Sequence, residues 1–311
     1  MTHRCPWRRA FTLIELLVVL AILGVLIGLL VPALQQVRAS ANRLACASNL
    51  RQLALAVHAY HDAHRRIPYN QFLGAYGGGP DSTAWSWLAR LLPYLDQQNL
   101  YTQGGLPTKT LRQSGIADQQ LAVFLCPADP DSNAGPRTDA LNLAGFAAGQ
   151  TNYKGVSGAN WGDDLQGDGA RVPTDWRNGG SNGSFDGHSN GDGIFYRVDY
   201  LRRLRLEHIR DGTAATFLIG EDVPAVSQSC SWPYGNNATG TCAIPPNAKA
   251  PDGSAYPAWN WQNNESFRSH HPGGLHFACA DASVHFLSDT IALPLYRALA
   301  TIRGGEPVSL P

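Results

Sequence analysis

Two residues near the C-terminus could act together as a general acid and base. His271 begins the segment HPGGLHFACADASVHF, and Asp281 lies further along it in a short polar turn. A histidine and a carboxylate within hydrogen-bond reach can move protons. An aspartate in a turn also bonds its own backbone, and the two side chains could simply hydrogen-bond to each other across a hairpin. We favour this structural interpretation, because the chain supplies no nucleophile or oxyanion site nearby, and we expect a non-enzymatic protein.

Residue types that bind zinc lie in this segment and directly before it. They are His270, His271, His276, His285 and Cys279. In an extended strand His276 and Cys279 point to opposite faces, so they could not share one ion. We therefore predict no metal in this segment.

A glycine-rich stretch contains acidic residues spaced as in a calcium loop. Asp164, Asp168 and Asp175 could each offer carboxylate oxygens to one ion. The flanking glycines are not typical of EF-hand helices. An ordinary solvated loop is the alternative, and we expect no cofactor besides this candidate calcium.

The cysteines predict two disulfides. Cys230 and Cys242 bracket a segment rich in Pro, Gly and Asn, which has the composition of a loop closed by a disulfide. We also pair Cys46 with Cys126, which leaves Cys279 as a buried thiol on a strand. No C-x-x-C pair is present, so the sequence does not support a zinc ribbon or a thioredoxin-like motif.

The elements that position these residues begin with a long apolar stretch. Residues 11–34 contain one charge, Glu15, and as a helix they reach roughly 36 Å, enough to cross a bilayer. Arg4, Arg8 and Arg9 precede them and favour a cytoplasmic N-terminus, with the rest of the chain exported.

The helix should continue beyond the bilayer as far as Arg66. Apolar residues recur at helical spacing over residues 35–66, and Pro68 ends the pattern. The apolar positions are Val37, Ala41, Leu44, Leu50, Leu53, Val57 and Tyr60. This stripe must be covered, most economically by a β-sheet. We predict short helices over 82–101, strands at 121–125, 151–156, 193–198, 214–220, 275–280 and 284–287, and an irregular surface region over 135–192.

The start of the chain resembles the signal of type IV prepilins and of type II secretion pseudopilins. Residues 11–16 read FTLIEL, the motif of that class, after a basic leader. The resemblance implies that prepilin peptidase cuts between Ala10 and Phe11 and methylates the new amino group. It also implies that Glu15 pairs with the amino terminus of a neighbouring subunit, whereas a hydrated Glu15 near the membrane surface is the alternative. The family expects glycine where this chain has Ala10.

The rest of the chain resembles a large family of prepilin-like proteins, abundant in planctomycetes, with an H-x9-DG signature and a domain of unknown function numbered 1559. The matching landmarks are CASNLRQLALAVHAYHDAHRRIP, WSWLARLLPYLDQQNLY, FLCPADP, TNYKGVSG and DGTAATFLIGE. His271 and Asp281 match the signature, with Ala282 in place of its glycine. Since alanine is disfavoured at positive φ, we expect a different turn type there.

Composition and resemblance together predict an α+β pilin-like fold with long irregular loops, in which the long helix packs on an antiparallel sheet. Lys plus Arg equals Asp plus Glu, 24 each, so nothing indicates nucleic acid. The predicted divisions are a leader (1–10), a membrane helix (11–34), its amphipathic continuation (35–66) and an exported domain (67–311). We expect a subunit of the inner membrane that assembles with other pilins or pseudopilins in a pilus or secretion filament. The alternative is an uncleaved single-pass protein with a periplasmic ligand- or glycan-binding domain.

Overall fold

The computed structural model describes residues 13–71, 78–132, 134–162, 174–179, 191–305 and 310. The chain divides into two compact units, Met1–Arg43 and Leu44–Pro311. We call the second unit, residues 44–311, the folded domain.

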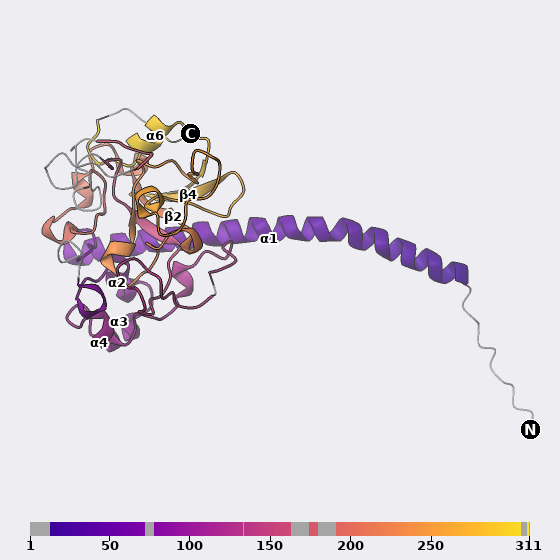
Figure 1. Ribbon diagram of the computed structural model, residues 1–311, viewed down its shortest axis with the longest axis horizontal. Helices are drawn as coiled ribbons and strands as arrows, with labels where there is room; N and C mark the ends of the chain where they lie inside the picture. The colour runs from indigo at the N-terminus through magenta and orange to yellow at the C-terminus, as the bar shows by residue number, and fades with distance from the viewer. Residues whose placement is uncertain are drawn as a thin grey trace, which may run out of the picture. The chain divides into compact units, whose positions relative to one another are not determined.

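The long helix α1 runs from Leu13 to His64 and contributes to both units (Figure 1). Within the folded domain its buried face includes Cys46, Leu50, Leu53 and Val57, at the spacing of one helical face. The prediction that this face begins at Val37 is wrong, because Val37 is 65% exposed and the folded domain begins only at Leu44.

The helix ends two residues earlier than predicted. Arg65 has a φ of 54° and its N–H donates to the carbonyl of His61 at 2.7 Å. A residue in the left-handed conformation is a common helix C-terminus. The turn therefore closes α1 at His64.

Short helices supply much of the remaining regular structure. The α-helices are α2 (Trp87–Arg90), α3 (Gln98–Gly104), α4 (Leu111–Ser114), α5 (Trp261–Asn264) and α6 (Leu293–Ala298). The 3-10 helices are η1 (Gly79–Asp81), η2 (Leu92–Tyr94), η3 (Ala122–Phe124), η4 (Asp199–Leu201), η5 (Leu206–His208), η6 (Thr213–Ala215), η7 (Pro224–Val226) and η8 (Gly235–Asn237). The predicted short helices over 82–101 correspond to α2, η2 and the start of α3.

The described residues form a mixed sheet in the order β3-β1-β2-β4-β5. Its strands are β1 (Tyr153–Val156), β2 (Phe217–Glu221), β3 (Thr239–Gly240), β4 (Gly274–Cys279) and β5 (Val284–Ser288). All neighbouring pairs are antiparallel except β1 and β3, which are parallel. The α+β class is confirmed, and the expectation of a purely antiparallel sheet is wrong at β3.

Apart from the edge strand β5, the sheet is buried on both faces. Consecutive side chains of β4 point to opposite faces and join different hydrophobic clusters. Phe277 belongs to the cluster that contains Tyr296 of α6, whereas Ala278 belongs to the cluster that contains Leu50 of α1. His58 of α1 also bonds the carbonyl of Ala280 at 2.8 Å. The second half of α1 and α6 therefore contribute to the cores on opposite faces of one sheet (Figure 1).

Two predicted strands are absent from the structure. Residues 121–125 form η3, whose carbonyls at Ala122 and Leu125 accept bonds from the Asn49 side chain. Residues 193–198 bend into a turn because the Asp199 carboxylate accepts the N–H of Tyr196. The expected surface location of residues 135–192 is also wrong in part, since residues 148–162 are buried.

Candidate functional site

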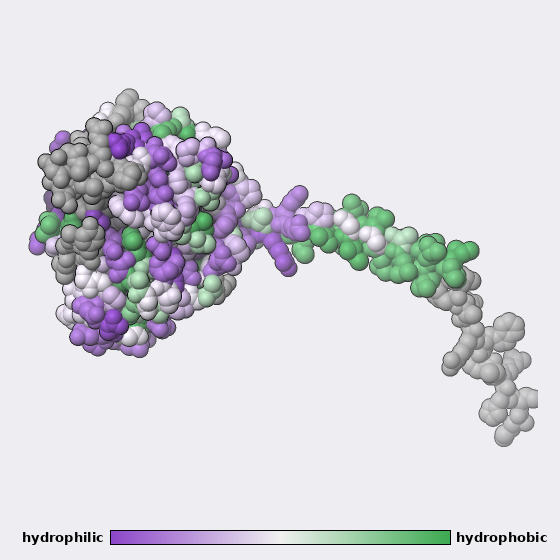
Figure 2. All heavy atoms as spheres, viewed as in Figure 1, coloured by the Kyte–Doolittle hydropathy of each residue, from purple (hydrophilic) through white to green (hydrophobic). Residues whose placement is uncertain are grey.

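The N-terminal part of α1 presents an exposed apolar surface. Over residues 13–43 its large hydrophobic side chains are 45–77% exposed. α1 is long and apolar enough to cross a membrane, and none of its most apolar stretch is buried in the protein. Figure 2 shows these hydrophobic residues along the helix. Such a surface requires lipid or other helices to cover it.

Glu15 is the acidic residue in the first turn of this apolar helix, and it is exposed. Ala10 and Phe11, the predicted cleavage and methylation positions, lie outside the described residues. The pairing of Glu15 with a neighbouring amino terminus therefore stays a prediction.

Inside the folded domain a carboxylate is held by two histidines. Glu221 ends β2, and its Oε1 lies 3.0 Å from Nδ1 of His276 on β4 and 3.3 Å from Nε2 of His271. The backbone N–H of His276 donates to Oε2 at 2.8 Å. Burial alone would raise the pKa of Glu221, but the bonds from both histidines lower it to about 2.

The Cys46–Cys126 disulfide lies beside this carboxylate. The structure contains the predicted bond, which joins α1 to the segment after η3. Cys126 Sγ is 3.8 Å from Nε2 of His271. We call the group formed by Glu221, His271, His276 and this disulfide the Glu221 centre.

His271 and Asp281 belong to different sites. His271 contacts Glu221 before β4 begins, whereas Asp281 lies beyond the end of β4 and accepts bonds from the N–H and Oγ of Ser283. Asp281 therefore shapes the β4–β5 turn and forms no acid–base pair with His271. Ala282 in that turn has a φ of 67°, so the expectation that alanine would avoid positive φ there is wrong.

The three remaining cysteines of the folded domain are free and buried. The predicted Cys230–Cys242 disulfide is wrong, because the residues between them form no exposed loop but are buried and include β3. Cys230 Sγ donates to Asp222 Oδ2 at 3.2 Å, whereas Cys242 belongs to the apolar cluster of Phe217 and Tyr296. Cys279 is a buried thiol on β4, as predicted.

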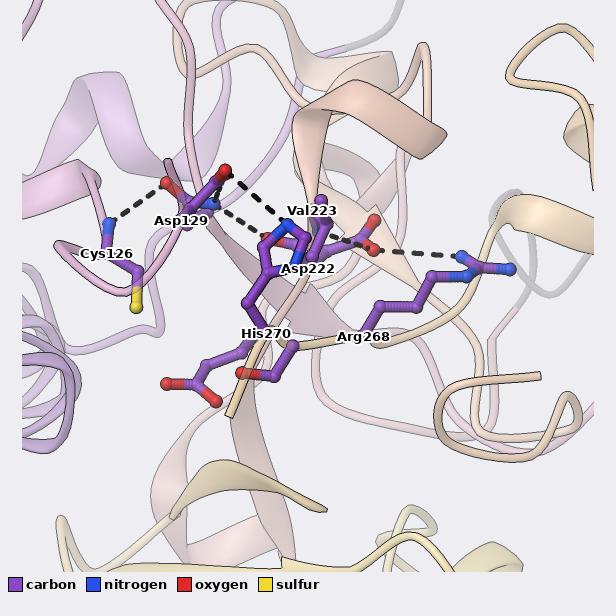
Figure 3. A pocket seen from close by; sticks show the side chains of 9 residues that line it. Cys126, Asp129, Asp222, Val223, Arg268 and His270 are labelled. Carbon is purple, nitrogen blue, oxygen red and sulfur yellow. Dashed lines mark hydrogen bonds and ion pairs between the residues drawn. The ribbon is translucent and has the colours of Figure 1, made fainter. Parts of the chain in front are cut away.

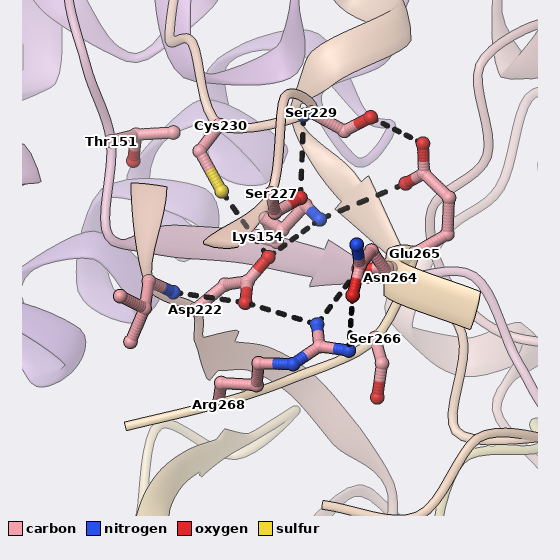
Figure 4. A network of polar contacts seen from close by, with 12 residues as sticks. Thr151, Lys154, Asp222, Ser227, Ser229, Cys230, Asn264, Glu265, Ser266 and Arg268 are labelled. Carbon is pink, nitrogen blue, oxygen red and sulfur yellow. Dashed lines mark hydrogen bonds and ion pairs between the residues drawn. The ribbon is translucent and has the colours of Figure 1, made fainter. Parts of the chain in front are cut away.

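A buried ionic network includes Asp222, the residue that follows Glu221 in the chain. Figure 4 shows this network. Lys154 Nζ is 2.8 Å from Asp222 Oδ2 and 3.7 Å from Glu265 Oε2, and its side chain is fully buried. Burial acts to lower the pKa of Lys154, but the nearby carboxylates raise it above its usual value. Arg268 Nη1 lies 3.7 Å from Asp222 Oδ1 and also donates to the carbonyl of Asn264.

This network was not predicted from the sequence. One signal was available, because Lys154 lies in TNYKGVSG and Asp222 directly follows the apolar run FLIGE. A charge inside or directly after a buried strand usually requires a partner.

Two pockets adjoin the Glu221 centre and the ionic network. The smaller one, lined by Asp129, Asn152, Arg268, His270 and their neighbours, is shown in Figure 3. Its volume is about 10 Å³, which is about the minimum needed to hold one water. Asn152 bridges its walls by donating to Asp129 at 2.7 Å and to the carbonyl of Asp222 at 3.0 Å.

The larger pocket has a volume of about 340 Å³. Its lining includes Asn247, Lys249, Tyr256, His270 and Asp289. Both its size and its mixed lining are in the range of small-molecule sites.

The candidate calcium loop is described only at Asp175. Its carboxylate accepts the hydroxyl of Tyr256 at 2.7 Å. Asp164 and Asp168 lie outside the described residues, so calcium there stays a prediction.

The fold and the apolar helix together define an α+β protein with an N-terminal membrane-capable helix. Two family models match the chain. Residues 35–293 match the family described as "Protein of unknown function (DUF1559)", and residues 8–31 match the "Prokaryotic N-terminal methylation motif". The chain belongs to the first of these families, and its N-terminal motif supports a type IV pilin-like protein. Neither model describes an enzyme family.

Comparison with curated proteins and with solved structures finds no match. Four segments that lie far apart in the sequence converge in space. Cys46, Cys126, Glu221 and His271 come from four different motifs and meet at the Glu221 centre.

Proposed function

We propose that this protein is a structural subunit that prepilin peptidase cuts before Phe11 and that assembles through α1 with other pilin-like subunits. The filament is a type IV pilus or a type II secretion-like pseudopilus. The observation that carries the proposal is the exposed apolar part of α1, which begins with Glu15 and matches the methylation motif.

The assembly mechanism follows from this surface. In the inner membrane lipid covers the apolar helix, and in the filament the helices of neighbouring subunits take its place. A carboxylate at membrane depth costs about 2.5–3.5 kcal/mol on insertion scales, so pairing with the methylated amino terminus of a neighbour favours the assembled state. The basic leader keeps the N-terminus cytoplasmic and places the folded domain outside.

The first test is the N-terminal sequence and intact mass of the protein recovered from membranes. We expect a start at N-methylated Phe11. An Ala10→Gly variant, which restores the residue that the motif prefers, should be cut at least as completely. Recovery of the intact leader in both proteins would contradict processing.

Assembly is tested separately with a Glu15→Val variant. We expect this variant to be processed but to remain in the membrane instead of the sheared filament fraction. Gln36→Ala on the same helix is the matched control and should assemble. Normal assembly of Glu15→Val would contradict the role of the carboxylate.

The pocket of about 340 Å³ supports a second candidate, an anchored domain that binds a small polar ligand or glycan. This candidate predicts an uncleaved leader. It also predicts that a panel of monosaccharides and disaccharides raises the unfolding temperature of the full chain, and that Asp289→Ala at the pocket reduces the increase. The absence of any such increase would contradict it.

A further inference from the structure

Four side chains of the folded domain converge as ligands for a tetrahedral metal ion. The ligand atoms of Cys46, Cys126, Glu221 and His271 all lie within 4.8 Å of one another, and all four residues are at most 5% exposed. We propose that, once the Cys46–Cys126 disulfide is reduced, these four residues bind one Zn²⁺. This inference does not depend on filament assembly.

The ligand set and its spacing fit zinc. Zn²⁺ prefers four ligands drawn from thiolate, imidazole and carboxylate, and its bond lengths place neighbouring ligand atoms roughly 3.3–3.8 Å apart. His271 Nε2 already lies 3.8 Å from Cys126 Sγ and 3.3 Å from Glu221 Oε1. The change required is that the two sulfurs move apart, as they must when their bond is broken.

The surroundings hold two of the ligands in position. His276 bonds Oε1 of Glu221 through Nδ1 and Oε2 through its backbone N–H. Such a second layer fixes a ligating carboxylate and strengthens metal binding. His271 turns Nε2 toward both the sulfur and the carboxylate, so a metal ion would take the place of the contact that this nitrogen now makes with Glu221.

The redox step balances with a phosphine as the reductant. The phosphine transfers two electrons to the S–S bond and becomes a phosphine oxide, while water supplies its oxygen and the two thiol protons. Zn²⁺ binding then releases both thiol protons to the solvent. The Glu221 centre thus has two states. In the oxidised state Cys46 and Cys126 form a disulfide, and in the reduced state their thiolates bind Zn²⁺.

The test is a Co²⁺ titration of the full chain in detergent, with and without a phosphine. Reduced protein should bind one Co²⁺ per chain, with thiolate-to-cobalt charge-transfer absorption and the visible bands of tetrahedral cobalt, and Zn²⁺ should displace it. Oxidised protein should show no such bands.

Variants identify the ligands. Loss of a residue that only hydrogen-bonds a metal ligand weakens metal binding roughly 10–100-fold. In reduced protein, His271→Ala removes a ligand itself and should weaken Co²⁺ binding by at least this factor. Cys126→Ala should remove the two-thiolate spectrum. The matched controls His285→Ala and Cys279→Ala lie outside the centre and should bind as the wild type does.

Tryptophan fluorescence checks that each protein stays folded. If a ligand variant unfolds, the conservative Glu221→Gln variant replaces it, and it should weaken binding while the fold is retained. Three results would overturn the proposal: folded, reduced wild type without thiolate bands, bands that persist in the folded ligand variants, or a reduced wild type that unfolds even with Zn²⁺ present.

Discussion

Asp199 illustrates how burial changes the behaviour of a single residue. Its carboxylate is buried and accepts the backbone N–H groups of Asn70 at 2.5 Å and Tyr196 at 3.3 Å. Burial raises the pKa of Asp199 to about 7, although Arg202 and the two N–H donors act in the opposite direction. Asp199 therefore links the turn at residues 193–198 to Asn70, in the segment that follows α1.

The raised pKa predicts a pH-dependent stability. The folded state binds the Asp199 proton more tightly than the unfolded state, in which the pKa is about 3.8. The stability from this group is therefore complete below about pH 4 and is lost as the pH rises to about 7. Since one pKa unit is about 1.4 kcal/mol, the loss is of the order of a few kcal/mol.

The measurement compares wild type with Asp199→Asn by denaturant unfolding at pH 4.5 and pH 7.5. The free energy of unfolding of the wild type should fall relative to that of the variant at the higher pH. Asp131→Asn, at an exposed carboxylate, controls for the loss of one negative charge. A wild-type-to-variant difference that is the same at both pH values would contradict the prediction.

At the scale of elements, the disulfide fixes α1 to the rest of the folded domain. Cys46 and Cys126 are 80 residues apart in the chain, so the bond closes a long loop. In the chain-entropy model a loop of this size stabilises by roughly 4–5 kcal/mol, and measured values are about 2–5 kcal/mol. The stability of a typical domain is about 5–15 kcal/mol, so the reduced domain is expected to remain folded.

We predict that Cys126→Ala lowers the free energy of unfolding by about 2–5 kcal/mol. Denaturant unfolding followed by tryptophan fluorescence, with a chelator present to exclude metal, measures the change. Wild type treated with a phosphine should approach the variant. Equal stability of oxidised wild type and variant would show that the bond contributes little.

At the scale of the whole molecule, the two units have different requirements. Residues of the first unit expose apolar side chains and need lipid or neighbouring helices, whereas the folded domain has its own cores on both faces of the sheet. The contribution of α1 to those cores begins at Cys46.

A chain that begins at Leu44 should therefore keep the stability of the folded domain. We expect its free energy of unfolding to lie within about 0.5 kcal/mol of that of the full chain, as for changes at exposed sites. A chain that begins at Leu55 would lack Cys46, Leu50 and Leu53, and it should fail to unfold cooperatively. Strong destabilisation of the Leu44 chain would show that the first unit supports the domain.

Local patterns along the chain determined the elements that depend on near neighbours. The apolar run and its basic leader predicted a membrane-capable helix, and helical spacing placed Leu50, Leu53 and Val57 on a buried face. Two strand-like segments on either side of a short polar turn predicted β4 and β5. These signals are local because lipid exposure and backbone periodicity act over a few turns or residues.

Tertiary structure alone decided the contacts between distant segments. Glu221, His271 and the two disulfide cysteines come from separate motifs, and their distances depend on how β2 and β4 pair and where α1 packs. The composition of the segment between Cys230 and Cys242 predicted a disulfide, but that segment is buried and includes β3, and the two thiols have different partners. Spacing along a chain does not determine which buried groups meet, because that depends on the packing of the whole domain.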